Sequence, residues 1–285
     1  MLTQAEKDLL AQRFPYLTAV RPEDSNKGTF GTLGIIGSAP QMNGACVLAG
    51  SAALKTGCGK VIIGFNQNKL PLAIVENAPE LILNIANELI NNKHITAWVI
   101  GCGLGIQSAA VILIKNMLQY INNGAKVLID ADGLNILSIQ AEAIKLTENC
   151  IITPHPKEAS RLLACSVEKI QQNRVESAIK LAGIYHCWVV LKGHATVIAA
   201  PNGKTWINET GNSGLATAGS GDVLSGIIGS LLAQNIPLSE AAQAGVWLHG
   251  KAADDLVSQG IGPIGLTAHE LINSVRMLRN QLVRR

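Results

Sequence analysis

Short runs of consecutive apolar residues, separated by longer amphipathic segments, constrain the fold of this chain more than any other feature. Six such runs lie at residues 33–37, 61–65, 98–100, 127–129, 151–153 and 188–191. Continuous apolarity is typical of β-strands that are covered on both faces. Two intervening segments, 43–56 and 108–122, carry apolar residues at helical spacing and precede Gly57 and Gly124, which suit helix ends. The pattern predicts strands and helices that alternate around a parallel sheet.

The pattern changes near residue 192. Strand-like runs at 195–200 and 204–208 flank a Pro-Asn-Gly turn, which predicts a β-hairpin. Three further helices are predicted near residues 222–234, 238–257 and 267–283. We therefore predict an α/β protein, a three-layer α/β/α sandwich whose central sheet is mainly parallel, with a β-hairpin late in the chain.

Composition and chain organisation narrow the class of protein. Hydrophobic residues make up 48% of the chain and charged residues 15%, so a large core can form and disorder is excluded. The formal net charge is +3 and 4% of the residues are aromatic, which argues against nucleic-acid binding. Because no linker or repeat is visible, residues 1–285 are predicted to form one domain, with residues 1–26 as a polar N-terminal extension.

The sequence also predicts the cellular compartment. The six cysteines contain no C-x-x-C pair and are expected to be reduced and structural. No signal peptide and no apolar run long enough to span a bilayer are visible. We expect a cytoplasmic protein that does not associate with a membrane.

The stretch most informative about function is glycine-rich and lies directly ahead of a predicted helix. Residues 211–222 read GNSGLATAGSGD. Glycines allow close backbone approach and unpaired amides at a helix start attract anions, so Gly219, Ser220 and Gly221 are predicted to form an anion hole. Asp222, which the helix dipole helps to keep ionised, would accept a proton from an attacking hydroxyl group. The alternative is that Asp222 merely caps the helix and that Gly226 and Gly229, farther along it, merely permit tight helix packing.

Two common nucleotide-binding motifs are absent. Residues 203–205 read GKT, but Ile198 stands where the first glycine of a Walker A motif is required. Residues 101–106 read GCGLGI, and Ile106 replaces the last glycine of the Rossmann fingerprint. The P-loop class is thereby excluded and hydride transfer is disfavoured. A glycine-rich loop remains at the carboxyl end of a strand, where open α/β sheets bind ligands.

Three more motifs end predicted strands, and each leaves two interpretations open. The prolines on either side of His155 hold it as a binding or proton-handling group, or form a stiff turn. Residues 192–196, KGHAT, suit a phosphate or nucleotide, or form an ordinary connection. Asp130 and Asp132 organise Mg²⁺ through water, or start a helix. No structural metal is expected, because four histidines have no partner at metal-ligand spacing: His94, His186, His249 and His269.

Together these motifs resemble those of the ADP- or ATP-dependent NAD(P)H-hydrate dehydratases, which belong to the ribokinase-like superfamily. The matching motifs follow in family order: LGIIGS, IGCGLG, DADGLN, TPHPKE, LKGHAT and AGSGDVLSG. The resemblance covers residue 27 to the C-terminus and implies repair of reduced nicotinamide cofactors that are hydrated at carbon 6. Cys102, Lys157 and Asn26 depart from the family pattern, where proline, glycine and histidine are usual.

The resemblance implies roles for individual residues. The hydrate would contact Ala45, Gly103, His155 and Asp222, with Asp222 as the catalytic base. The adenine nucleotide, ADP or ATP, would contact Lys192, Gly193, His194, Ala195, Thr196 and Gly221. Mg²⁺ would help the turn amides to offset charge on the phosphoryl group. An NAD(P)H-hydrate epimerase is implied as a functional partner, and a homotetramer as the assembly.

The expected reaction is nucleotide-dependent dehydration of the S epimer of NADH hydrate or NADPH hydrate. The alternative is a ribokinase-like kinase for a vitamin precursor or sugar alcohol, because the G-S-G-D turn suits both. A nucleotide-sensing module without turnover is a third possibility, against which the presence of the complete acid-containing turn argues.

Overall fold

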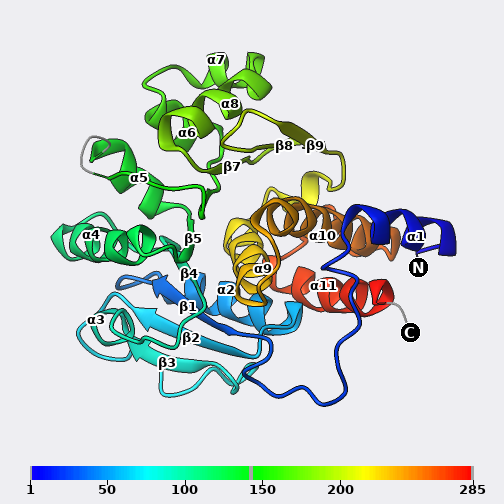
Figure 1. Cartoon of the computed structure of the whole chain (residues 1–285), viewed down its shortest axis with the longest axis horizontal. Helices are drawn as coiled ribbons and strands as arrows, with labels where there is room; N and C mark the ends of the chain where they lie inside the picture. The colour runs from blue at the N-terminus through cyan, green and yellow to red at the C-terminus, as the bar shows by residue number, and fades with distance from the viewer. Residues whose placement is uncertain (1, 141–143, 284–285) are drawn as a thin grey trace.

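A computed structural model describes residues 2–140 and 144–283 (Figure 1). Nine strands form one sheet in the order β3-β2-β1-β4-β5-β6-β7-β8-β9. The strands are β1 (Thr32–Gly37), β2 (Lys60–Phe65), β3 (Ile82–Ile85), β4 (Ala97–Ile100), β5 (Lys126–Ile129), β6 (Cys150–Ile152), β7 (Trp188–Leu191), β8 (Thr196–Ala199) and β9 (Thr205–Asn208). Pairing is parallel from β3 through β7, and β8 and β9 add antiparallel strands.

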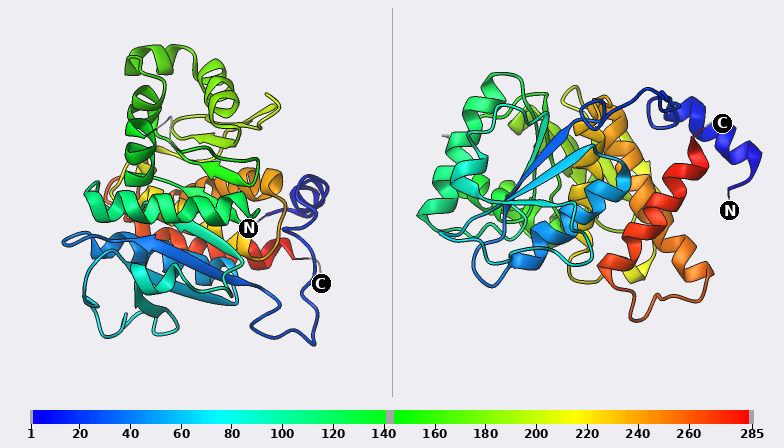
Figure 2. Two further views of the ribbon diagram at one scale, coloured as in Figure 1. Left: turned by 60° about the vertical axis from the view of Figure 1, so that its left-hand side comes forward. Right: turned by 90° about the horizontal axis from the view of Figure 1, so that it is seen from below.

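Helices cover both faces of the sheet (Figure 2). The helices are α1 (Gln4–Arg13), α2 (Asn43–Thr56), α3 (Ala86–Leu89), α4 (Ser108–Asn122), α5 (Asp132–Ile139), α6 (Pro156–Leu162), α7 (Val167–Gln172), α8 (Arg174–Tyr185), the 3₁₀ turn η1 (Ser213–Leu215), α9 (Ser220–Ala233), α10 (Leu238–Ser258) and α11 (Ala268–Leu282). Successive residues of one strand enter opposite cores: Ile35 belongs to the core that contains residues of α2, α9, α10 and α11, and Ile36 to the core that contains residues of α3 to α6 and α8. The predicted three-layer sandwich is confirmed.

Burial on both faces explains why the apolar runs were readable as strands. Their structural bounds differ from the predicted ones by one residue at most, and α2 and α4 match the predicted ranges. The hairpin begins at Thr196 instead of residue 195, because Ala195 adopts φ +52° and cannot join the ladder. α9 begins at Ser220, so Asp222 is the third helical residue and not the first.

The N-terminal segment is more than a polar extension. Thr3 and Glu6 form a capping box that starts α1, and Phe14 and Leu17 behind this helix are buried in the core with α10 and α11. The Leu2 amide donates to the Gln281 side chain at 3.2 Å, so the first residues lie beside the end of α11 (Figure 1). The composition of residues 1–26 did not reveal these buried residues, because they are few and widely spaced among polar ones.

Helix α9 packs unusually close to its neighbours. A Cβ on Gly226 would come within 2.0 Å of the Ala49 carbonyl oxygen on α2, and one on Gly229 within 2.4 Å of Val99 on β4. The packing role considered for these glycines is therefore confirmed, and it fixes the first turn of α9 at the carboxyl edge of the sheet. In the described part of the chain, every helix is too short or too polar to cross a bilayer.

Candidate active site

The glycine-rich stretch forms the turn that starts α9. Gly219 precedes the helix with φ +85°, and a Cβ there would come within 2.5 Å of the Leu48 side chain. No acceptor among the described residues meets the amides of Gly219 and Gly221, whereas the Ser220 amide meets the Thr217 carbonyl at 3.4 Å. Unpaired amides at a helix start are donors for an anion. This is the geometry that an anion hole requires.

Asp222 lies half-buried in the first turn of α9. Burial and the negative charge of Asp130 raise the pKa of Asp222 to about 6, while the Cys102 thiol and Lys192 act in the opposite direction. The expected influence of the helix dipole is thus outweighed by desolvation. A carboxyl group with this pKa is ionised at pH 7 and is still basic enough to accept a proton.

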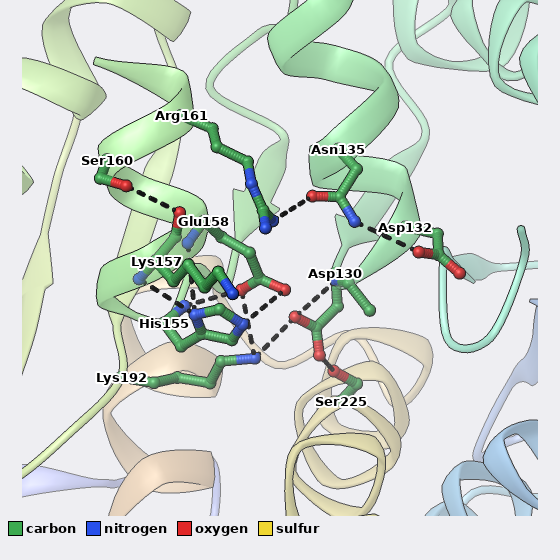
Figure 3. Close-up of polar contacts among 11 residues, drawn as sticks. Asp130, Asp132, Asn135, His155, Lys157, Glu158, Ser160, Arg161, Lys192 and Ser225 are labelled. Atoms are coloured by element: carbon green, nitrogen blue, oxygen red, sulfur yellow. Dashed lines mark hydrogen bonds and ion pairs between the residues drawn. The ribbon is translucent and has the colours of Figure 1, made fainter. Parts of the chain in front are cut away.

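A buried ion pair lies next to the turn and joins two strand ends. Lys192 Nζ, after β7, is 2.7 Å from Asp130 Oδ1, after β5, and Asp130 Oδ2 accepts a 2.7 Å hydrogen bond from Ser225 Oγ on α9 (Figure 3). Although burial opposes it, the charge of Lys192 and these hydrogen bonds lower the pKa of Asp130. A Cβ on Gly221 would lie 3.4 Å from Lys192 Nζ, so the pair and the turn border the same space.

Glu158 and His155 extend this charged cluster, which we define as Asp130, His155, Glu158 and Lys192. Glu158 Oε2 is 4.0 Å from Lys192 Nζ, and Glu158 Oε1 is 3.2 Å from His155 Nε2 (Figure 3). Burial raises the pKa of Glu158 to about 7 and lowers the pKa of His155. Two buried carboxyl groups therefore share one ammonium group.

The rigid mounting predicted for His155 is produced by a capping box at the start of α6. His155 Nδ1 accepts the amides of Lys157 and Glu158 at 3.1 and 3.2 Å, so its proton lies on Nε2 and faces Glu158. In return Glu158 Oε2 accepts the His155 amide at 2.8 Å. Sequence analysis did not single out Glu158 as a site residue, although its position three residues after a capping residue was a usable signal.

Two of the residues implied to contact the hydrate, Ala45 and Gly103, lie side by side in the structure. A Cβ on Gly103, after β4, would lie 3.1 Å from Ala45 Cβ at the start of α2. The strand order changes direction between β1 and β4, which is where open α/β sheets bind ligands. The thiol of Cys102, the residue before Gly103, lowers the pKa of Asp222, so this loop lies beside the Asp222 carboxyl group. His155 is linked to the turn through Glu158 and Lys192 of the charged cluster.

The loop at residues 192–196 continues from the charged cluster. The Lys192 amide donates to the Pro154 carbonyl at 2.8 Å, which joins this loop to the segment that carries His155. Gly193 and Ala195 have φ of +137° and +52°, and Thr196 Oγ1 donates to the Gly193 carbonyl at 2.9 Å. The Lys192 ammonium is thus held by Asp130, and the rest of the loop lies open beside it.

Two further side chains have structural partners that the sequence left undecided. Asp132 accepts the Gly105 amide at 2.9 Å and the Asn135 amide group at 3.2 Å, so it starts α5 and fixes a neighbouring loop. His249, which has no partner at metal-ligand spacing in the sequence, is buried with Nε2 3.3 Å from Ser220 Oγ, and burial lowers its pKa to about 4. It supports the turn from α10, a contact that no local spacing could have indicated.

The donor set for a metal ion is small. Within residues 2–140 and 144–283, no group of three or more His, Cys, Asp or Glu side chains is arranged to hold a metal. Asp130 and Glu158 offer carboxylate oxygens beside Lys192. These two groups would be the carboxylates available to hold a Mg²⁺ ion, which prefers oxygen ligands.

Comparison with known proteins agrees with this arrangement. Residues 33–276 match the family model for NAD(P)H-hydrate dehydratase. The chain is 50% identical over 277 residues to the ADP-dependent (S)-NAD(P)H-hydrate dehydratase of Neisseria meningitidis, covering 96% of this chain and 93% of that protein. This chain belongs to the NAD(P)H-hydrate dehydratase family. Its ribokinase-like α/β architecture is therefore the fold expected of a family member.

A solved family structure and a longer relative extend the comparison. The ADP/ATP-dependent NAD(P)H-hydrate dehydratase of Bacillus subtilis, co-crystallized with ATP/Mg²⁺, superposes with a TM-score of 0.81 at 31% identity, covering 93% of this chain and 94% of that one. The bifunctional NAD(P)H-hydrate repair enzyme of Coxiella burnetii is 39% identical over 94% of this chain. This match covers 54% of the Coxiella protein, so the chain spans about half the length of that relative.

Proposed function

We propose that this chain catalyses the dehydration of the S epimer of NADH hydrate or NADPH hydrate, with ADP or ATP as the phosphoryl donor. The products are NAD(P)H, inorganic phosphate, and AMP or ADP. The observation that carries the proposal is the position of Asp222 beside the unpaired amides of Gly219 and Gly221. An acid and an anion hole at one helix start suit phosphoryl transfer to a hydroxyl group.

In the proposed first step Asp222 accepts the proton of the 6-hydroxyl group of the hydrate. The oxygen of that hydroxyl group attacks the terminal phosphoryl group of the nucleotide. Asp222 is suited to this because its pKa of about 6 leaves it ionised at pH 7. The free amides of Gly219 and Gly221 would hydrogen-bond to the transferred group and offset its developing charge, and the Ser220 amide would join them by giving up its long 3.4 Å bond to Thr217. Ala45, Gly103 and His155 would contact the hydrate.

The second step removes the new phosphate ester. The bond between carbon 6 and oxygen breaks, the ring nitrogen supplies electrons, and loss of a proton from the adjacent carbon restores the dihydropyridine. The hydroxyl oxygen therefore leaves in inorganic phosphate. Mg²⁺, when bound, supplies positive charge to the phosphate oxygens, and Asp130 and Glu158 are the carboxylates that would hold it through water.

The nucleotide would occupy the side of the site formed by the 192–196 loop. We assign its contacts to Lys192, Gly193, His194, Ala195, Thr196 and Gly221. Support comes from the shared border of Gly221 and Lys192, where a Cβ would lie 3.4 Å from Nζ. The glycine at this position keeps the space between the amides and the ammonium group free for phosphate oxygens.

A kinase for a vitamin precursor or sugar alcohol remains the second candidate, because the same turn would transfer a phosphoryl group to any hydroxyl. It is less supported, since the matching family model and the half-identical Neisseria relative are both described as dehydratases. The two functions differ after the first step: a kinase product keeps its phosphate.

Isotope transfer separates these functions in one experiment. NADH hydrate that carries ¹⁸O in the 6-hydroxyl group is incubated with the protein, ADP and Mg²⁺, and the phosphate is analysed by mass spectrometry. We expect recovery of near-ultraviolet nicotinamide absorbance together with one ¹⁸O atom per released phosphate. A stable labelled phosphate ester would identify a kinase, and release of unlabelled phosphate would contradict the proposed attack by the hydroxyl group.

The chain is proposed to act as one catalytic domain, with an NAD(P)H-hydrate epimerase as its functional partner. The longer Coxiella relative is named a bifunctional repair enzyme, and the match leaves about half of it uncovered. An epimerase would convert the R hydrate into the S epimer that this site uses. The cytoplasmic location and the homotetramer stay predictions.

A further inference from the structure

Arg174, at the start of α8, lies directly behind the 192–196 loop, and the mechanism above gives it no role. Its Nη2 donates to the carbonyl oxygens of Leu191 and Lys192 at 2.9 and 3.3 Å. A Cβ on Gly193 would lie 3.0 Å from Arg174 Nη1. One guanidinium group thus binds two consecutive carbonyl groups where β7 becomes the loop, and it occupies the space that a side chain at the next position would need.

These contacts determine the direction of a loop amide. In a planar trans peptide the carbonyl and the following N–H point to opposite sides. Because the Lys192 carbonyl is turned toward Arg174, the Gly193 N–H is turned away from it, toward the open side of the loop. No acceptor in the described part of the chain meets the Gly193 amide, which is therefore a free donor on that side.

The charge of Arg174 is also uncompensated. No carboxylate in the described ranges lies within ion-pair distance of its guanidinium group, whose remaining partner is the neutral Gln171 side chain at 3.1 Å. Arg174 Nε is buried and has no hydrogen-bond partner there. An arginine that serves only as a structural brace would be expected to have its buried donors paired.

We infer that Arg174 is a positioning residue for nucleotide binding: it holds the 192–196 loop so that the Gly193 amide faces the phosphates, and it adds positive charge behind them. The inference rests on the proposed function. Arg174 is not placed to touch the hydroxyl oxygen or the phosphorus atom that react. Its removal should therefore reduce the fraction of protein whose 192–196 loop can bind the nucleotide, and it should leave the rate of the chemical step unchanged. If that fraction falls to about a tenth, the nucleotide KM rises about tenfold.

The test compares Arg174→Met, Arg174→Lys and a control, Lys180→Met, which removes the same charge from an exposed position of α8. Steady-state kinetics are measured with ADP varied at saturating hydrate, and then the reverse. We expect Arg174→Met to raise the ADP KM about tenfold or more, with kcat and the hydrate KM within about twofold of wild type. Arg174→Lys should recover part of the loss, because an ammonium group can reach one carbonyl, and Lys180→Met should match wild type.

A lower melting temperature with an unchanged ADP KM would overturn the inference and leave Arg174 a structural brace. An equal rise in the Lys180→Met variant would overturn it as well, because general charge would then explain the effect. If Arg174→Met does not fold, Arg174→Lys decides the question through the same ADP KM. Failure of wild-type protein to convert the hydrate would instead count against the proposed function.

Discussion

The glycine-rich turn and the charged cluster are neighbours where Gly221 approaches Lys192, and they differ in the groups that they offer to a ligand. The turn presents backbone amides that have no partner, and its geometry depends on the absence of a side chain at Gly219. The cluster presents side chains that are already paired, since Lys192 holds Asp130 at 2.7 Å. The turn therefore has free donors for a ligand, whereas the paired side chains of the cluster stabilise the folded protein.

This difference predicts that the largest effect on turnover comes from the turn. Asp222→Asn keeps the shape of the first turn of α9 but removes the proton acceptor. We expect kcat to fall by about 10²–10⁴-fold or more, with ADP affinity within a few-fold of wild type. Calorimetric titration with ADP and a single-turnover absorbance assay measure the two quantities. A variant with near-normal kcat would remove Asp222 from the mechanism.

The largest effect on stability is expected from the cluster. Lys192→Met leaves Asp130 buried without its cation, which should lower the free energy of unfolding at pH 7 by about 3–5 kcal/mol. Asp130 has a lowered pKa in the folded wild type, so it stabilises the protein above its unfolded pKa and loses this effect as pH falls. Without Lys192, burial raises the pKa of Asp130 above its unfolded value, so the folded variant takes up a proton first. The deficit of the variant should therefore shrink as pH falls from 7, and it should be smallest at acid pH, where Asp130 is protonated in both proteins.

A matched control for this measurement is Lys251→Met. Lys251 pairs with Asp255 at 2.8 Å on the surface of α10, where both side chains are at least 21% exposed. Exposed pairs of this spacing contribute about 0.3–0.5 kcal/mol. Urea unfolding that finds equal losses for both lysine variants would contradict the assignment of the cluster as a stabilising unit.

The smallest effect distinguishes two glycines within the turn. Gly219→Ala combines a positive φ with a methyl group 2.5 Å from Leu48, and should cost about 1–3 kcal/mol of stability. Gly221→Ala meets no such strain and should be neutral or stabilising by up to about 1 kcal/mol, because it lies inside a helix. Its methyl group should nevertheless raise the ADP KM. Thermal unfolding and ADP kinetics of both variants test this contrast.

Sequence alone predicted those parts of the molecule whose cause is local. The strands were readable because residues such as Ile35 and Ile36 enter opposite cores and must both be apolar. Strand β3 was missed because its residues are only partly covered, with Ile82 46% exposed at the edge of the sheet. Its apolar pattern is therefore weaker than that of the central strands.

The candidate site was likewise predictable only where its residues are contiguous in the sequence. The glycine-rich turn was predicted because its residues are contiguous, and the structure gives it free amides. The partners of Asp130 and Ser220 were not predicted, since Lys192 is 62 residues from the first and His249 is 29 residues from the second. Contacts of this kind depend on which strand ends become neighbours, and composition or spacing does not encode that.

The hydrogen bond from Ser225 to Asp130 has a practical consequence for protein engineering. Ser225 lies one turn beyond Asp222, so the helix that carries the proposed base is also bound to the carboxylate that holds Lys192. Transplanting the G-S-G-D turn into another scaffold would transfer the amides without the Ser225–Asp130 hydrogen bond that orients the helix behind them. A working graft needs Ser225, Asp130 and Lys192 as one cassette, together with the adjacent parallel strands that bring them into register.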